Sequence, residues 1–165
     1  GFRNLVLIML LGMLGLRLAS LLSLNIEDID LETGLIYITD KGQLQRTLFL
    51  PEILCAILSK YLKHLNLSYG PLFLSKKNKR FSAHTLKNIF KQAICALDID
   101  KKLHAHLFRH TAATYLNKVS NPKVTQYILG HNRMANTLQY THLNPDKYAV
   151  YTKCHPYNRK EETNV

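Results

Sequence analysis

Residues 104–142 read HAHLFRHTAATYLNKVSNPKVTQYILGHNRMANTLQYTH, and this stretch carries the most informative pattern in the chain. It contains His106 and Arg109 in the motif H-x-x-R-H-T-x-A-T, then Leu-Gly-His ending at His131, then Tyr140 nine positions later. The planar fork of an arginine can bind two phosphate oxygens and stays charged. A tyrosine hydroxyl can act as a covalent nucleophile. The stretch therefore indicates a phosphate clamp beside a tyrosine nucleophile.

Two earlier segments extend the pattern. Residues 15–24 read GLRLASLLSL and contain Arg17, and residues 39–47 read TDKGQLQRT and contain Lys41. With residues 104–142, they resemble the tyrosine recombinases, also called phage integrases, whose first arginine box and lysine-bearing β-hairpin they match. The resemblance runs over nearly the whole chain and fills six family positions in the family's order: Arg17, Lys41, His106, Arg109, His131 and Tyr140.

This resemblance implies a fold and a chemistry. The expected fold is α+β and mostly α, a helical catalytic domain with a small antiparallel β-hairpin or sheet. The implied activity is cutting and rejoining of duplex DNA at a specific site, through a 3′-phosphotyrosyl intermediate and without metal, ATP or another cofactor. The implied roles are Arg17 and Arg109 as the phosphate clamp, Lys41 as general acid, His106 as acid/base, His131 as hydrogen-bond donor to the phosphate and Tyr140 as nucleophile.

The resemblance also implies partners and a domain organisation. The expected partners are double-stranded DNA and, in the synaptic complex, three further copies of the protein. Residues 1–165 are expected to form a single catalytic domain, and residues 145–165 to pack on a neighbouring protomer. The chain opens at Gly1 inside an apolar segment, so we expect a fragment that lacks the family's N-terminal DNA-binding domain.

One departure concerns the residues after the first arginine. The family usually has x-Ser-Glu there, and the acidic group helps to hold the guanidinium. This chain has Leu18, Ala19 and Ser20 instead. How Arg17 is oriented is therefore an open question for the sequence.

Composition and charge agree with a nucleic-acid partner. The 165 residues are 47% hydrophobic, enough for one domain with a core, and the net charge is +11. Residues 53–145 contain 14 Lys or Arg and two acids, whereas residues 1–52 carry four basic residues and six acidic ones. Such an asymmetry favours a polyanionic binding partner, although many basic surfaces serve only solubility.

The predicted DNA contacts are basic residues of two segments. Residues 75–80, SKKNKR, are predicted to form a basic loop. This loop either contacts the DNA backbone or is simply solvated, and the sequence leaves both alternatives open. The second segment is the polar face of a helix that Ser82 is predicted to cap. The contact residues are Lys76, Lys77, Lys79, Arg80, Lys87 and Lys91.

Other segments predict the remaining elements. The apolar run at residues 5–16 is too short for the roughly 20 residues of a membrane span, so we expect a buried helix that ends near Leu14. Further helices are predicted at about residues 17–24, 51–65, 82–97, 104–118, 122–129 and 134–142, with a β-hairpin over residues 34–50. Three widely spaced cysteines, without a C-x-x-C pair, indicate neither a disulfide framework nor a thiolate metal site, and they favour a cytoplasmic location, in a bacterium, a phage or a mobile element.

Several alternatives stay open. A zinc hydrolase could use His104, His106, His110 and His131, but no Glu lies between the histidines as in H-E-x-x-H. A catalytically inactive, basic helical DNA-binding module would explain the charge. A type IB topoisomerase-like strand relaxase would share the chemistry. Tyr148 and Tyr151 are other candidate nucleophiles, but only Tyr140 stands at the family spacing from Leu-Gly-His.

Overall fold

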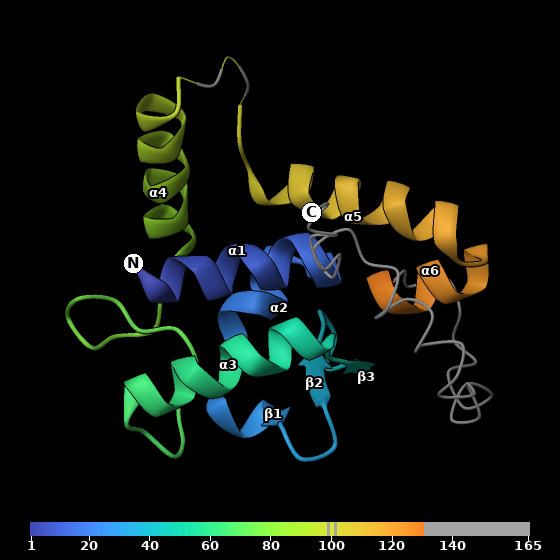
Figure 1. Ribbon diagram of the computed structural model, residues 1–165, viewed down its shortest axis with the longest axis horizontal. Coiled ribbons are helices and arrows are strands. Elements are labelled where there is room, and N and C mark those ends of the chain that lie inside the picture. Colours follow the sequence, from blue (N-terminus) through green and yellow to red (C-terminus); the bar gives the residue numbers. More distant parts are fainter. Residues whose placement is uncertain (99, 101, 131–165) are drawn as a thin grey trace, which may run out of the picture.

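A single apolar helix is the centre of the fold. The computed structural model describes residues 1–98, 100 and 102–130. Helix α1 (Phe2–Leu14) packs against α3 (Glu52–Leu65) on one side and α5 (Ala105–Val119) on the other (Figure 1). Its buried side chains are fully inaccessible to solvent: Val6, Leu7, Leu10, Leu11, Met13 and Leu14. The predicted core helix is confirmed, and no helix in the described part of the chain is long and apolar enough to cross a membrane.

A tight turn ends α1 and presents the first candidate catalytic residue. Gly15 caps the helix in the left-handed conformation, with φ 58°, and its N–H donates to the Leu11 carbonyl. Helix α2 (Leu18–Ser23) follows, and Arg17 is its N-cap residue. An ideal Cβ on Gly15 would lie 2.8 Å from Leu129 Cδ2 and 3.0 Å from Ala112 Cβ. The absence of a side chain at Gly15 therefore lets this turn pack directly on the C-terminal helices.

The sheet is small and antiparallel. After the 3-10 helix η1 (Ile26–Asp28), strands β1 (Ile29–Asp30), β2 (Leu35–Thr39) and β3 (Gln45–Phe49) pair in the order β1-β2-β3. The predicted hairpin is confirmed. Strand β1 was not predicted, because two residues are too few to show an alternating pattern. In the hairpin Ile38 lies opposite Arg46, and both side chains are buried.

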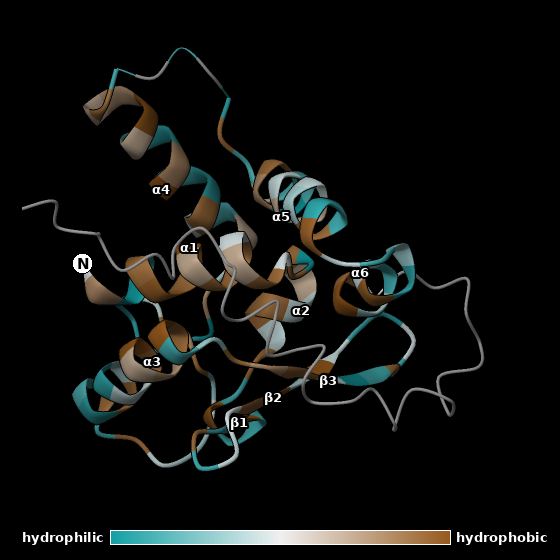
Figure 2. Ribbon diagram, turned by 45° about the vertical axis from the view of Figure 1, so that its right-hand side comes forward, coloured by the Kyte–Doolittle hydropathy of each residue, from teal (hydrophilic) through white to brown (hydrophobic). Residues whose placement is uncertain are grey.

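The remaining helices begin where the sequence predicts. Helix α4 (Ala83–Ala96) starts after Ser82, whose side chain accepts from the Thr85 N–H at 3.2 Å. Helix α6 (Pro122–Leu129) starts with a proline in its first turn. Figure 2 shows α1 mostly in the tan and brown of hydrophobic residues, with teal, hydrophilic segments on the helices around it. The helix predicted at about residues 134–142 lies outside the described residues.

The packing at Gly15 yields a first prediction. Gly15→Ala adds a methyl group that must displace Leu129 or Ala112, and it also puts alanine in the left-handed region. Overpacking costs about 1–3 kcal/mol beyond the roughly 1–2 kcal/mol of the left-handed conformation. We expect urea unfolding to show that the free energy of unfolding falls by the sum of these two costs.

Gly34→Ala is the matched control. Gly34 has a similar φ of 67°, but an added Cβ would meet only Cys55 Sγ, at 3.9 Å. This variant should lose only the conformational part. Equal losses for the two variants would contradict the close packing at Gly15.

Candidate active site

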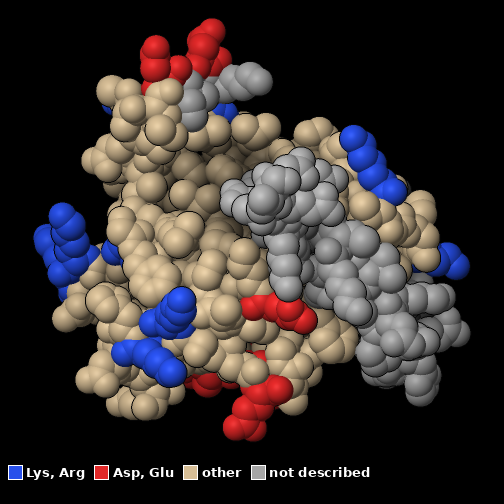
Figure 3. Space-filling model, viewed as in Figure 1, with Lys and Arg blue, Asp and Glu red and all other residues tan. Residues whose placement is uncertain are grey.

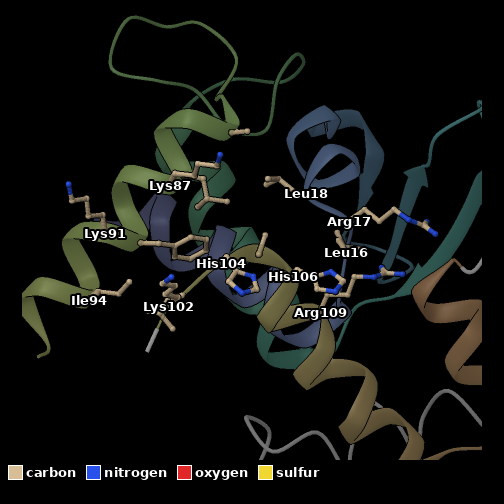
Figure 4. A pocket seen from close by; sticks show the side chains of 15 residues that line it. Leu16, Arg17, Leu18, Lys87, Lys91, Ile94, Lys102, His104, His106 and Arg109 are labelled. Atoms are coloured by element: carbon tan, nitrogen blue, oxygen red, sulfur yellow. The ribbon is translucent and has the colours of Figure 1, made fainter. Parts of the chain in front are cut away.

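Two helices and the turn before α2 enclose a cavity of about 740 Å³. Its floor is apolar and includes Leu16, Leu86 and Phe90. Its basic lining residues come from separate parts of the chain: Arg17, Lys87, Lys91, Lys102, His104, His106 and Arg109. Figure 4 shows Lys87 and Lys91 on α4 at one side, and Arg17, His106 and Arg109 at the other. The structure therefore brings three of the six predicted catalytic residues into one cavity.

Arg109 joins the ends of two helices. Its Nη1 donates to the Gly15 carbonyl and its Nη2 to the Leu129 carbonyl, both at 2.6 Å. Burial above all, and then the like charges of Arg17 and Arg46, lower the pKa of the Arg109 guanidinium to about 10. Arg109 is therefore still protonated at neutral pH, in a setting where an added anion would relieve unfavourable charge.

Arg17 lies next to Arg109 and is held from two sides. Its Nη1 forms an ion pair with Asp40 Oδ1 at 3.0 Å, and its Nη2 donates to the Gly130 carbonyl. The side chain is still 34% exposed. In Figure 4 the Arg17 and Arg109 side chains extend in the same direction. The two guanidinium groups can therefore face one ligand.

Asp40 binds two arginines at once, which the sequence analysis did not foresee. Its Oδ2 pairs with Arg46 Nη1, and its Oδ1 accepts from Ser20 Oγ at 2.6 Å as well as from Arg17. The Asp40 side chain is 7% exposed. A Cβ on Gly130 would overlap Arg46 and Asp40, so the backbone at the end of α6 lies directly on this cluster.

One signal for this cluster was present in the sequence. Arg46 alternates with Leu48 along β3, so it occupies a position that faces the core. Because arginine is almost never fully buried unless it is paired, this position predicts a nearby carboxylate. Asp40 and Glu52 are both six positions from Arg46 in the sequence, and Asp40 is the one that lies in the same hairpin.

The other predicted catalytic residues lie in different parts of the chain. His106 is exposed in the first turn of α5 and lines the cavity. Lys41 is exposed in the hairpin turn directly after Asp40. It is not one of the described residues that line the cavity. His131 and Tyr140 lie outside the described residues, as do the alternative nucleophiles Tyr148 and Tyr151.

The predicted DNA-contact residues separate into two locations. Lys87 and Lys91 line the cavity, and Lys102, which the sequence analysis did not single out, joins them. Lys76, Lys77 and Lys79 are exposed in the 75–80 loop. Figure 3 shows basic side chains over this loop at one edge of the molecule and acidic ones around β1 at the lower edge.

Arg80 differs from its lysine neighbours. Its Nη1 donates to the carbonyls of Leu22, Ser23 and Leu24, at 2.8–3.2 Å, and its Nη2 donates to Asn25 Oδ1 at 2.6 Å. These carbonyls form the C-terminal end of α2, where a cation is favourable. Arg80 therefore stabilises the helix that begins at Arg17, a role the sequence did not indicate.

The donor set for the zinc alternative is incomplete in the described part of the chain. Residues 1–98, 100 and 102–130 contain no group of three or more His, Cys, Asp or Glu side chains that could hold a metal ion. His104 accepts a hydrogen bond from the Leu107 N–H at its Nδ1, as the N-cap of α5. That ring nitrogen is therefore engaged in capping.

Comparison with known proteins places the chain in a family. Residues 1–147 match the model of the phage integrase family. The chain belongs to this family. Its described fold, mostly helical with a three-stranded antiparallel sheet, agrees with the fold expected for a tyrosine recombinase catalytic domain.

Individual relatives of the integrase domain are recombinases. Tyrosine recombinase XerC of Thermodesulfovibrio yellowstonii is 31% identical over 159 residues, which cover 90% of this chain and 53% of that protein. The crystal structure of XerA recombinase is 29% identical, with a TM-score of 0.71 over 94% of this chain and 59% of that one. XerH bound to difH substrate is 27% identical, with a TM-score of 0.66 over 90% of this chain and 45% of that one. The chain spans about half the length of the curated relatives it matches.

The contacts of Arg80 yield a second prediction. Arg80→Ala removes a charged donor from three carbonyls and an amide, so the integrase domain should lose about 1–2 kcal/mol of unfolding free energy, discounted because the contacts are largely exposed. Urea unfolding followed by circular dichroism measures this loss.

Lys79→Ala is the control from the same loop. The Lys79 side chain is exposed, and surface substitutions usually change stability by less than about 0.5 kcal/mol. If the two variants unfold alike, Arg80 is a solvated residue like its neighbours.

Proposed function

We propose that this chain is the catalytic domain of a site-specific tyrosine recombinase, which cleaves and rejoins duplex DNA through a 3′-phosphotyrosyl intermediate. The observation that carries the proposal is the pairing of Arg17 and Arg109 in one cavity with His106. Membership of the phage integrase family supports it. Relatives named as recombinases, one of them bound to its DNA substrate, support it further.

The two arginines stabilise the charge of the reacting phosphate. Arg17 and Arg109 reach the cavity from opposite ends of the domain sequence and bring several N–H donors to one place. In the transition state negative charge grows on the two non-bridging oxygens. Preorganised donors aimed at such charge contribute roughly 3–4 kcal/mol each to catalysis.

The remaining roles complete a balanced reaction. The Tyr140 hydroxyl oxygen attacks the phosphorus, the bond from phosphorus to the 5′-oxygen breaks, and His106 accepts the phenol proton. Lys41 supplies a proton to the departing 5′-oxygen, which is a poor leaving group as an alkoxide. His131 donates a hydrogen bond to the phosphate. Rejoining runs the same steps backwards, so neither ATP nor a metal is consumed.

The basic residues around the cavity contact the DNA backbone. Lys87, Lys91 and Lys102 line the cavity beside the phosphate clamp, so they follow the strand on either side of the scissile phosphate. Lys76, Lys77 and Lys79 contact the backbone from the 75–80 loop. Such contacts release counterions and make binding strongly salt-dependent.

The organisation of the active assembly is part of the same proposal. The chain acts as a single catalytic domain of a longer recombinase, in a synaptic tetramer in which residues 145–165 pack on a neighbouring protomer. A cytoplasmic location, in a bacterium or as the product of a phage or mobile element, fits an enzyme that acts on DNA.

A covalent-adduct assay tests the function without a known target site. The substrate is a pool of duplexes with a randomised core and one nick in its middle, so that a cleaved 5′-hydroxyl fragment is lost and the intermediate accumulates. We expect a protein–DNA adduct that survives SDS, forms in EDTA and, once sequenced, reveals the preferred site. Tyr140→Phe should abolish the adduct because it removes the attacking oxygen.

Tyr148→Phe and Tyr151→Phe are the matched controls and should form the adduct at the wild-type rate. Loss of the adduct in either of them, with Tyr140→Phe active, would assign the nucleophile to another residue. A chain that binds DNA and forms no adduct is the inactive DNA-binding module, and relaxation of supercoiled DNA without exchange of strands would indicate a topoisomerase.

A further inference from the structure

Arg17 needs a partner that fixes its direction. An arginine side chain carries about 2 kcal/mol of rotamer entropy, and a guanidinium must point at the phosphate before the reaction to act as a preorganised donor. The first turn of α2, which follows Arg17, contains no acidic residue. The carboxylate that holds Arg17 comes instead from the β-hairpin, at Asp40.

The environment of Asp40 fixes the carboxylate itself. Arg46, whose side chain is 5% exposed, binds one oxygen, and Ser20 donates to the other at 2.6 Å. Asp40 is buried with them at 7% exposure, while the side chain of Arg17, which lines the cavity, is 34% exposed. The buried Asp40–Arg46 ion pair thus gives the more exposed Arg17 a rigid anchoring point.

We propose that Asp40 is a positioning residue that aims the Arg17 guanidinium at the scissile phosphate, with Arg46 and Ser20 holding the carboxylate in place. This inference rests on the proposed function. Because Asp40 directly precedes Lys41, the same contact also ties the turn that carries the general acid to the phosphate clamp. Asp40 does not touch the substrate and acts through Arg17.

The first experiment measures the rate of adduct formation on the duplex selected by the wild-type chain. Asp40→Asn should lower this rate by about 10- to 100-fold, the usual loss when a partner that orients a catalytic group is removed. Asp30→Asn is the matched control, since it removes a carboxylate at the end of β1 in the same sheet, where the Asp30 side chain accepts from the Glu32 N–H of the following turn. Asp30→Asn should react at the wild-type rate.

A second substrate tests whether Asp40 acts through Arg17. A methylphosphonate at the scissile position has one non-bridging oxygen fewer to carry charge, so one arginine suffices. On this substrate the deficit of Asp40→Asn should shrink to within about threefold, as should that of Arg17→Ala. The double variant Arg17→Ala/Asp40→Asn should be no slower on the normal duplex than Arg17→Ala, because residues that act as one unit are not additive.

Two further variants test whether Asp40 acts by orienting Arg17 or only by neutralising the buried charge of Arg46. Removing Asp40 also takes a carboxylate partner from the buried Arg46 guanidinium, which is destabilising. Asp40→Asn/Arg46→Met removes both buried charges, so it should fold and still react slowly. Ser20→Glu/Asp40→Ala moves the carboxylate to a position whose side chain lies against Asp40, three residues after Arg17, and it should recover most of the rate.

The outcomes are distinct. Recovery of the rate in Asp40→Asn/Arg46→Met, or a deficit of Asp40→Asn that persists on methylphosphonate, would overturn the positioning role and leave Asp40 as the neutralising partner of Arg46. Failure of the wild-type chain to form any adduct overturns the proposed function, and this inference with it. A wild-type rate in Asp40→Asn overturns this inference alone.

Discussion

The cavity end of the domain depends on one buried carboxylate that is shared by two arginines. Asp40 binds Arg17 through one oxygen and Arg46 through the other, and Arg109 lies close enough for both guanidinium groups to lower its pKa. Three cations around one carboxylate repel one another. The cluster is tolerated because peptide carbonyls also accept hydrogen bonds from Arg17 and Arg109 and offset part of their positive charge.

These carbonyls belong to helix ends. Gly15 follows the last residue of α1, and Leu129 and Gly130 end α6. Arg109 binds the carbonyls of Gly15 and Leu129, and Arg17 binds that of Gly130. The C-terminal end of a helix carries a partial negative charge and favours cations. Two helices thus direct their C-terminal ends at Arg17 and Arg109, and the left-handed glycines that end them allow the close approach. A phosphate would complete the balance of charge.

The sequence predicted the elements of the fold well because their signals are local. The apolar face of residues 53–65, the cap at Ser82 and the turn between two β runs each depend on neighbouring residues. The six family positions were also found as local motifs, and three of them, Arg17, His106 and Arg109, line one cavity.

What the sequence did not predict is pairing across long separations. Asp40 is 23 positions from Arg17, and Arg80 caps a helix that ends 57 residues earlier. Such contacts leave no periodic pattern. The core-facing position of Arg46 indicated a carboxylate nearby, but only the fold shows that the same carboxylate also holds Arg17.

The most direct test of the account is a crystal structure of the Tyr140→Phe chain bound to the duplex selected in the adduct assay. The account predicts that the guanidinium groups of Arg17 and Arg109 both lie within about 3 Å of the non-bridging oxygens of one phosphate. Asp40 should still pair with Arg17 and Arg46 in that complex. A phosphate bound by neither arginine, or an Arg17 that has left Asp40 to reach the DNA, would contradict it.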